Sequence, residues 1–381
     1  MGENQFLIPG LVDTHIHAPQ YVFTGTGYDR TLLDWLTTYT FPREAEFASE
    51  QIAKDSYTMA VDRSLKSGTT TACYYGTIHV EATKILADII TAFGQRAFIG
   101  KVNMDTNSPD FYIERNAQES LNATKLVIDY ITSLKNPLIT PVITPRFVPS
   151  CTSELLLELG QLAKSKNLPI QSHLSETLSE IQWVQELFPK SSSYSEIYDV
   201  HGLLNDQTIM AHCVHLSKDE RELLLLRNVG ISHCAASNFC LSSGVLNVKR
   251  LFNQGFKKIG LGTDVAGGYS PSILESIRQS ITASKVVHIQ SRDSKNEIEP
   301  LSLAEAFYMA TLGGASVLNL ESKIGNFKVG KSLDAILVDM DSCRPIHTFV
   351  HDTLADKFEK FIYLGDDRHM KDIFVNGQSI L

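Results

Sequence analysis

Eight short apolar segments recur along the chain, and each of them ends in polar or ionisable residues. The segments span residues 6–17, 69–76, 96–105, 137–147, 168–176, 208–217, 229–238 and 257–268. Apolar runs of this length, with little polar alternation, are typical of parallel strands that are buried on both faces of a sheet. The pattern therefore predicts eight buried strands.

Segments with the apolar spacing of amphipathic helices lie between several of the predicted strands. The clearest of them span residues 50–66, 119–135, 152–166 and 218–227. Strands that alternate with helices indicate a parallel sheet, and eight such units are the number in an α/β (β/α)₈ TIM barrel. A doubly wound open sheet is the alternative, but no glycine-rich GxGxxG loop follows any of these strands.

The pattern changes after residue 268. Helical stretches continue to about Asn319, and two short apolar segments next to glycine turns follow at 334–339 and 372–380. We expect these two segments to form a small β appendage rather than a ninth barrel unit. The predicted domains are a (β/α)₈ barrel over residues 6–319 and a C-terminal β appendage over residues 320–381.

The composition limits what the protein can bind. The 381 residues carry a net charge of −9 without a lysine or arginine run, which argues against nucleic acid and membrane partners. The six cysteines form no CxxC pair, which is typical of a reduced intracellular protein without a cysteine zinc site. The first residues show neither a basic region nor a long apolar core, and no run of about eighteen apolar residues occurs, so we expect neither a signal peptide nor a membrane span. We therefore expect a cytoplasmic protein.

Two histidines leave the first predicted strand together. His15 and His17 are two residues apart, so in an extended strand both imidazoles point to the same face. By themselves they could be polar residues on a solvated face. In a closed barrel, however, all strand ends meet at one mouth, where His173 follows strand five and Asp264 follows strand eight. Three imidazoles and one carboxylate are a suitable ligand set for a catalytic zinc ion.

The same residues stand in motifs of a known superfamily. An HxH after strand one, histidines after strands five and six, and an aspartate after strand eight resemble the amidohydrolase superfamily. Within it, the chain resembles the guanine deaminase family on stretches spread over nearly its whole length. These are PGLVDTHIHAPQY, SGTTTACYY, FGQRAFIGKVNMD, TPRF, IQSHLSE, SHCAASN, GLGTDVAGGYS, ATLGGA and FIYLGDDR.

The resemblance implies a metal-dependent hydrolase that converts guanine and water to xanthine and ammonia, and it implies a homodimer. It also implies one Zn²⁺ per subunit, bound by His15, His17, His173 and Asp264. Binuclear members of the superfamily use a carboxylated lysine after strand four, whereas the fourth segment here, LITPVITPRF, contains no lysine. A single metal ion is therefore expected.

Three residues are expected to take part in the reaction. Glu176 lies three positions after His173, and the resemblance assigns to it the transfer of a proton from the attacking water to a ring nitrogen. Asp264 would bind zinc and share in proton transfer, and His212 would orient the attacking water. The alternatives are a helix-start carboxylate for Glu176, a helix cap for Asp264 and a core histidine for His212.

The substrate is expected at the same mouth of the barrel. The resemblance places the segments HAPQ and RF at the substrate, where Arg146 offers a planar fork of donors to a carbonyl oxygen. Gln20 can donate and accept, and Phe147 can stack on a purine face. Without the resemblance, Arg146 would be interpreted as a structural ion-pair partner. The predicted substrate-binding residues are His17, Ala18, Pro19, Gln20, Arg146, Phe147, His173, Glu176 and Asp264.

The short N-terminus leads to a separate expectation. Guanine deaminases usually have several dozen residues before PGLVDTHIH, and they supply strands of a small β-sandwich, whereas only MGENQFLI stands there in this sequence. We therefore expect an incomplete β-sandwich, in which the C-terminal strands lack partners and expose open edges and an apolar face. Such a chain would be less stable and less active than a longer one.

Two other functions remain open. The first is another amidohydrolase, a deaminase or chlorohydrolase that acts on a triazine or a nucleoside. The second is a catalytically silent isoform that serves as a subunit or binding partner. The short N-terminus is the reason for considering it. Metal content and turnover of the purified chain would separate these possibilities.

Overall fold

Eight parallel strands form the main sheet of the computed structural model, which describes residues 2, 4–292, 298–341 and 346–380. In spatial order they are β6 (Ile139–Pro141), β4 (Arg96–Gly100), β3 (Thr69–Tyr75), β2 (Leu11–His17), β11 (Ile259–Leu261), β10 (Gly230–His233), β9 (Thr208–His212) and β8 (Ile170–Leu174). Neighbouring strands in space are thus neighbours in sequence, apart from β2 and β11.

The two outer strands of this sheet meet and close it. Ile143, which follows β6, pairs in parallel with Ile170 of β8, and the Gln171 backbone N–H donates to Ile143 O over 2.8 Å. Two short strands, β5 (Val102–Asn103) and β7 (Thr144–Pro145), pair with each other beyond β4 and β6. The predicted (β/α)₈ barrel is therefore confirmed, and the open-sheet alternative is wrong.

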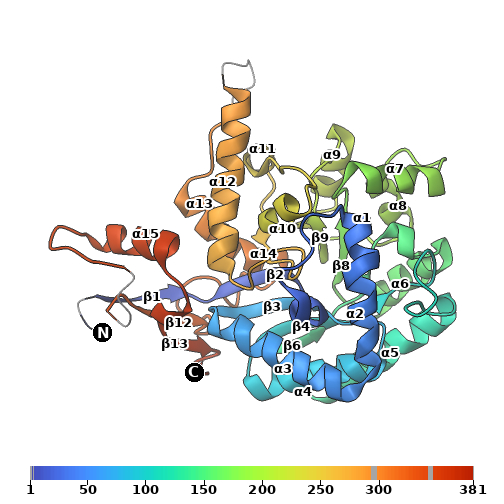
Figure 1. Ribbon diagram of the computed structural model, residues 1–381, viewed down its shortest axis with the longest axis horizontal. Helices are drawn as coiled ribbons and strands as arrows, with labels where there is room; N and C mark the ends of the chain where they lie inside the picture. The colour runs from blue at the N-terminus through green and yellow to red at the C-terminus, as the bar shows by residue number, and fades with distance from the viewer. Residues whose placement is uncertain (1, 3, 293–297, 342–345, 381) are drawn as a thin grey trace.

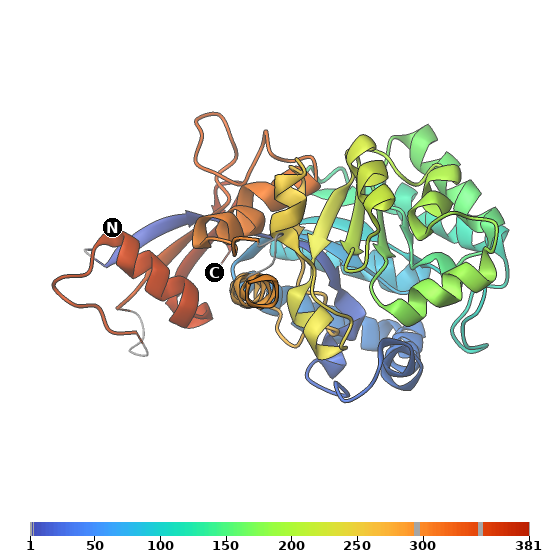
Figure 2. The same ribbon diagram turned by 90° about the horizontal axis from the view of Figure 1, so that it is seen from above.

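Helices surround the barrel (Figures 1 and 2). The four helices predicted from apolar spacing are α3 (Glu50–Lys66), α5 (Ala117–Ser133), α6 (Ser153–Lys166) and α9 (Lys218–Leu226). Each of them starts after an N-cap side chain that accepts a hydrogen bond from a backbone N–H of the first turn. These caps are Ser49, Asn116, Thr152 and Ser217.

The remaining helices complete the barrel and its additions. They are α1 (Leu32–Trp35), α2 (Phe41–Ala45), α4 (Val80–Phe93), α7 (Leu178–Leu187), α8 (Tyr194–Val200), α10 (Ala235–Cys240), α11 (Val248–Asn253), α12 (Ile273–Ser291), α13 (Leu303–Tyr308), α14 (Gly314–Val317) and α15 (Leu354–Leu364). Short helical turns include η1 (Ala18–Phe23) and the π-helical η2 (Leu36–Thr40). In the described part of the chain, no helix combines the length and the apolar character needed to cross a bilayer.

The first apolar segment forms two strands in two different sheets. β1 (Gln5–Pro9) pairs antiparallel with β12 (Ala335–Asp339), whereas β2 pairs with β3 in the barrel. Gly10 lies between them, where a Cβ atom would come within 2.2 Å of Thr70 Oγ1. A residue without a side chain is needed at this close approach. The single strand expected over residues 6–17 is therefore divided at Gly10.

The second sheet is antiparallel, in the order β1–β12–β13–β14, with β13 at Met370–Val375 and β14 at Gln378–Ser379. The expectation that the C-terminal strands lack partners is wrong, because β12 pairs with β1 on one edge and with β13 on the other. The expected open apolar face is also wrong for Ile336 and Ile373, which are fully buried. The domain division at residues 319 and 320 stays a prediction.

Helix α15 packs on this sheet, as the left side of Figure 1 shows. Phe6 of β1 contacts Phe358 and Phe361 of α15, with ring centroids 6.4 Å and 6.1 Å apart. Both contacts are edge-on, a favourable arrangement for aromatic rings. The apolar pattern does not predict α15, so the sequence gives no indication that a helix covers Phe6 on this sheet.

A buried ion pair joins the second sheet to the barrel. Asp334, just before β12, accepts hydrogen bonds from Arg96 Nε at 3.0 Å and from Arg96 Nη2 at 3.1 Å, and neither side chain is more than 7% exposed. Replacing Asp334 by alanine should leave the guanidinium buried without its counter-ion and lower the free energy of unfolding by about 3–5 kcal/mol. Urea unfolding would measure this loss.

A control for this prediction is the exposed pair of Lys66 and Asp62, whose nitrogen and oxygen lie 2.9 Å apart. Lys66→Ala should change the free energy of unfolding by less than about 1 kcal/mol, since water screens exposed ion pairs. Equal unfolding midpoints for Asp334→Ala and the unmodified chain would contradict the proposed link between sheet and barrel.

Candidate functional site

Four histidines and one aspartate meet at the C-terminal mouth of the barrel. His15 and His17 come from β2, His173 from β8, His212 from the end of β9, and Asp264 from the turn after β11. Asp264 Oδ1 lies 3.2 Å from His15 Nε2 and 3.4 Å from His17 Nε2. His17 Nε2 also lies 3.2 Å from His173 Nε2. The closed barrel thus brings together residues that are up to 249 positions apart (264 − 15).

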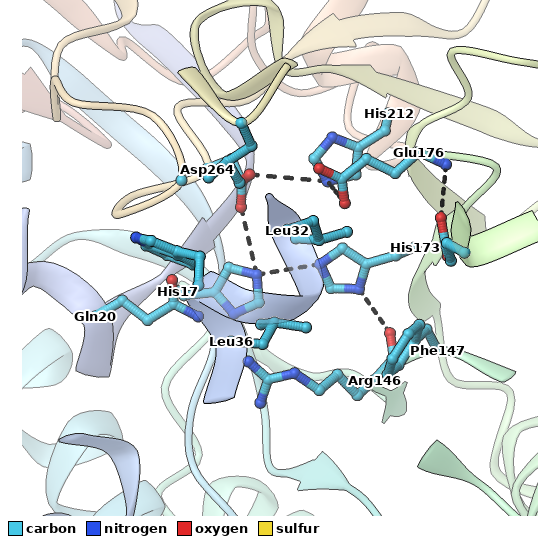
Figure 3. A pocket seen from close by; sticks show the side chains of 14 residues that line it. His17, Gln20, Leu32, Leu36, Arg146, Phe147, His173, Glu176, His212 and Asp264 are labelled. Carbon is cyan, nitrogen blue, oxygen red and sulfur yellow. Dashed lines mark hydrogen bonds and ion pairs between the residues drawn. The ribbon is translucent and has the colours of Figure 1, made fainter. Parts of the chain in front are cut away.

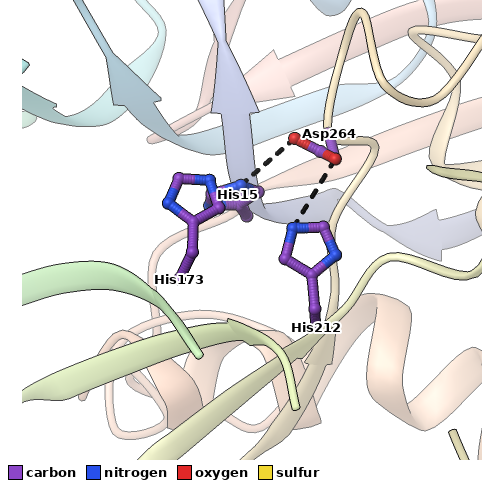
Figure 4. A group of neighbouring side chains, drawn as sticks. All are labelled: His15, His173, His212 and Asp264. Atoms are coloured by element: carbon purple, nitrogen blue, oxygen red, sulfur yellow. Dashed lines mark ion pairs between the residues drawn. The ribbon is translucent and has the colours of Figure 1, made fainter. Parts of the chain in front are cut away.

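His212 belongs to the same group of side chains (Figure 4). Its Nε2 lies 3.7 Å from Asp264 Oδ2, and ligand atoms of His15, His173, His212 and Asp264 all lie within 4.8 Å of one another. The predicted metal set contains His17 in place of His212. Both histidines face the same aspartate, so four imidazoles surround its carboxylate where three were expected.

The ring nitrogens on the far side of three histidines have acceptors. His15 Nδ1 lies 2.7 Å from Gln171 Oε1, His173 Nδ1 lies 2.6 Å from Arg146 O, and His212 Nδ1 lies 2.9 Å from Asn238 Oδ1. Since oxygen accepts in each case, Nδ1 carries a proton, and Nε2 of each ring is directed to the centre. Among the described residues, the buried Nε2 of His15 has no hydrogen-bond partner. This donor set fits a divalent metal ion.

The electrostatics of the group also fit a cation. Burial, together with the neighbouring His15, holds the pKa of His17 and of His173 well below the usual value, so both rings are neutral. Burial alone would raise the pKa of Asp264, but the interactions of its carboxylate with the nearby His15, His212 and His17 outweigh burial and keep the pKa low. Neutral imidazoles and an ionised carboxylate are the protonation states of metal ligands.

Glu176 reaches the same place from the turn after β8. Ser175, with φ of 49°, turns the chain at this point, and the buried Glu176 lines the cavity next to His212. Glu176 Oε2 lies 3.5 Å from His212 Nε2. Burial raises the pKa of Glu176 to about 7 despite the nearby His212. A carboxyl group of this pKa can take up and release a proton at neutral pH.

Ser243 holds the other oxygen of this carboxylate. Its hydroxyl donates to Glu176 Oε1 over 2.9 Å, and its carbonyl oxygen lies 2.6 Å from His215 Nε2. The backbone N–H of Ser243 donates to Asn238 O over 2.8 Å. Neither Ser243 nor Asn238 could be recognised from the sequence as part of this site, although the motif SHCAASN ends at Asn238. His233, which also ends a strand, is buried but does not line the cavity.

One cavity opens onto these residues (Figure 3). Its polar walls include Arg146 and Gln20, both of which are buried, and Phe147 lies beside Arg146. Ala18 and Pro19 of η1 are buried but do not line the cavity. The cavity is lined by His17, Gln20, Leu32, Trp35, Leu36, Arg146, Phe147, His173, Glu176, Glu180, His212, Leu241, Asp264 and Gly267.

One apolar wall of this cavity is not predicted from the sequence. Leu32 and Trp35 of α1 and Leu36 of η2 form it, together with Leu241 after α10. The helical elements α1 and η2 are only four and five residues long, and apolar spacing over such short stretches gives no distinctive signal. A cavity with a polar and an apolar wall suits a flat heterocycle with polar edges.

The chain and its fold match known proteins along nearly their whole length. The amidohydrolase family is matched over residues 6–380. A guanine deaminase of Dictyostelium discoideum is 50% identical over 378 residues, which cover 99% of this chain and 83% of that protein.

Solved structures agree with this match. A guanine deaminase from C. acetobutylicum with bound guanine in its active site has a TM-score of 0.93 and 41% identity, covering 100% of this chain and 88% of that one. An adenosine deaminase from Xanthomonas campestris with bound zinc has a TM-score of 0.84 and 25% identity, covering 99% and 80% of the two chains. The chain therefore belongs to the amidohydrolase family and, within it, to the guanine deaminases.

Proposed function

We propose that this chain catalyses the hydrolysis of guanine to xanthine and ammonia. The observation that carries the proposal is that one cavity is lined both by Glu176 with the cluster of histidines and Asp264, and by the hydrogen-bond donors of Arg146 and Gln20. The likeness to a structure with guanine in its active site supports the same substrate. So does the 50% identity with the guanine deaminase of Dictyostelium discoideum.

The metal ion of the proposal is one Zn²⁺, held by His15, His17, His173 and Asp264. Imidazole nitrogens and a carboxylate oxygen are the ligands of catalytic zinc sites, and the adenosine deaminase from Xanthomonas campestris holds zinc. When bound, such a cation supplies Lewis-acid activation of a water molecule at neutral pH. His212 is then free to orient that water with its Nε2.

Glu176 carries the proton in this proposal. Water attacks the ring carbon that bears the amino group, and Glu176 takes the proton of the water and gives it to the adjacent ring nitrogen. Asp264 passes the proton of the new hydroxyl group to the amino group, which leaves as ammonia while the carbonyl of xanthine forms. The pKa of about 7 for Glu176 and its 3.5 Å distance to His212 support these roles.

The base is held by the remaining walls of the cavity. Arg146 donates to the ring carbonyl oxygen of guanine, and Gln20 binds a neighbouring polar edge. Phe147 packs on the purine face, backed by an edge-on contact with Trp183 at 5.9 Å between ring centroids. Ala18 and Pro19 contribute by holding Gln20 in η1. His17, His173, Glu176 and Asp264 contact the base at its reacting carbon.

Ammonia release by the purified chain tests the proposal. We expect release from guanine and much less from adenosine, a triazine or a pterin at equal concentration. A preference for one of the other substrates would identify a different amidohydrolase. A folded chain with bound metal that releases no ammonia from any of them would be the silent subunit instead.

Replacing Arg146 by lysine should lower kcat/KM for guanine more than it lowers the metal content. Lysine keeps the positive charge but loses the planar fork of donors. We expect kcat/KM for guanine to fall by about 10- to 100-fold, which corresponds to the loss of one or two hydrogen bonds to a charged group. Steady-state kinetics and metal analysis measure the two effects. An unchanged kcat/KM would show that Arg146 is structural.

The proposal also includes a homodimer in the cytoplasm, as expected from the family resemblance. Sedimentation analysis of the purified chain would measure its mass in solution. A species of twice the 42.3 kDa chain mass is expected. The cellular location stays a prediction from the composition and the family resemblance.

A further inference from the structure

A buried glutamate stands behind the two residues that are proposed to bind the base. Glu44 of α2 is fully buried and lines no part of the cavity. Its Oε2 accepts a hydrogen bond from Arg146 Nη1 at 2.7 Å, and its Oε1 accepts one from Arg146 Nη2 at 3.1 Å. The Gln20 amide donates from Nε2 to Glu44 Oε1 over 2.9 Å. One carboxylate therefore contacts both residues.

The contacts leave Arg146 a single orientation. The two bonds to Glu44 fix the plane of the guanidinium, and Phe41 of α2 lies against it, with the guanidinium carbon 5.1 Å from the ring centroid. Burial alone would lower the pKa of Arg146, but the charge of Glu44 and its hydrogen bonds raise it. Nη1 also donates to Met104 Sδ over 3.5 Å, so the Nε–H and the second N–H of Nη2 are left for the cavity that Arg146 lines.

The same carboxylate fixes which way round the Gln20 amide stands. An ionised carboxylate only accepts hydrogen bonds, so the Gln20 NH₂ group must face Glu44. On its other side, Gln20 Oε1 accepts from the Ala266 backbone N–H at 3.1 Å. A flipped amide would place oxygen against oxygen and N–H against N–H. Gln20 thus presents donor and acceptor to the cavity in one fixed order.

Glu44 is itself held by a further hydrogen bond. The buried Tyr112 hydroxyl donates to Glu44 Oε2 over 2.8 Å. Glu44 also belongs to the continuous helical segment 32–45, whose first turns supply the apolar wall of the cavity through Leu32 and Leu36. This segment contains the π-helical turn η2, a feature that is frequent at functional sites. The apolar wall and the support of Arg146 therefore come from one element.

We propose that Glu44 is a positioning residue that sets substrate specificity, because it holds Arg146 and Gln20 in the one arrangement of donors that matches a purine with a ring carbonyl. This inference rests on the proposed guanine deamination. A purine without that oxygen gains nothing from the ordered guanidinium. The selectivity of the enzyme for guanine over such a purine depends on Glu44.

The test uses Glu44→Gln and compares guanine with 2-aminopurine, which keeps the reacting amino group and lacks the ring oxygen. The amide has nearly the same shape as the carboxylate but no charge, so Arg146 loses its counter-ion and the Gln20 amide is free to flip. We expect kcat/KM for guanine to fall by about 100-fold, as for a misplaced binding group. The value for 2-aminopurine should change by less than about threefold, because its binding does not use the lost arrangement.

A double variant separates positioning from general damage to the fold. If Glu44 acts mainly through Arg146, Glu44→Gln in an Arg146→Met background should lower kcat/KM for guanine by less than about tenfold, since only the hydrogen bond that orders Gln20 is left to lose. The double variant also removes both charges of the pair, so it avoids the buried unpaired cation of the single variant. Should Glu44→Gln fail to fold, Tyr112→Phe keeps the ion pair and should lower the guanine preference by about three- to tenfold.

The matched control is Asp334→Asn, which changes another buried carboxylate with two hydrogen bonds from an arginine, Arg96. It should lower the melting temperature and leave the preference for guanine over 2-aminopurine unchanged. An equal loss with both purines in Glu44→Gln, or an equal loss with and without Arg146, would overturn the inference. Because wild-type turnover of guanine is measured first, failure of the proposed function is distinguished from failure of the role of Glu44.

Discussion

Replacing Glu176 by glutamine should lower guanine turnover by about 10²- to 10⁴-fold, the usual contribution of a general acid–base group. Glutamine keeps the shape of the side chain and can still accept the hydrogen bond that Ser243 donates to Glu176 Oε1 at 2.9 Å. It has no proton to exchange near neutral pH, whereas burial places the pKa of Glu176 at about 7. The loss should therefore appear in kcat.

Metal content and guanine affinity should stay close to those of the unmodified chain. Metal analysis and calorimetric titration with guanine measure them separately from turnover. Glu220→Gln is a suitable control, because Glu220 is also buried and caps α9 through Ser217 without lining the cavity. It should lower the melting temperature and preserve turnover. A Glu176→Gln chain that turns over guanine at the normal rate would show that another group carries the proton.

Replacing His173 by alanine should remove most of the bound metal and, with it, almost all turnover. The purified chain should hold about one zinc ion, since one set of nitrogen and oxygen donors converges at the barrel mouth. The loss of one imidazole leaves the set incomplete, and the chain's remaining ligands hold the ion less tightly. Mass spectrometry of the metal and ammonia release with guanine check both parts of the prediction.

A histidine outside the barrel mouth provides the control. His201 follows α8, and its Nε2 lies 2.6 Å from Oγ of Ser153 at the start of α6. His201→Ala should therefore keep both zinc and turnover. Chelation of the unmodified chain should abolish turnover, and added zinc should restore it. Two tightly bound zinc ions per chain, or full zinc content in His173→Ala, would contradict the ligand set proposed above.

Much of the barrel could be predicted because it depends on local pattern. A strand that is buried on both faces favours apolar side chains in succession, and β9 and β11 are such strands. The helix α3 spans Glu50–Lys66, as its apolar spacing indicates. His15 and His173 could be identified as candidates because they lie at strand ends, and the active-site residues of this fold lie at the C-terminal ends of its strands.

Other features could not be predicted, because they arise from contacts between distant parts of the chain. Glu44 and Arg146 are 102 positions apart, and Ser243 and Glu176 are 67 positions apart. Neither Glu44 nor Ser243 stands at a strand end or in a periodic pattern that would mark it. Their importance follows from hydrogen bonds that exist only after the barrel and its loops have packed.

The eight-stranded barrel, the histidine and aspartate ligands at its mouth and the family could be predicted from the sequence alone. Apolar runs and motifs of a few residues carry this information. The tertiary structure alone decided that β1 pairs with β12, where Gln5 and Asp339 are 334 positions apart. It also decided that His212 shares Asp264 with the other histidines, and that Glu44 stands behind Arg146. Such neighbours are set by the closure of the sheet and the packing of loops, which no local pattern encodes.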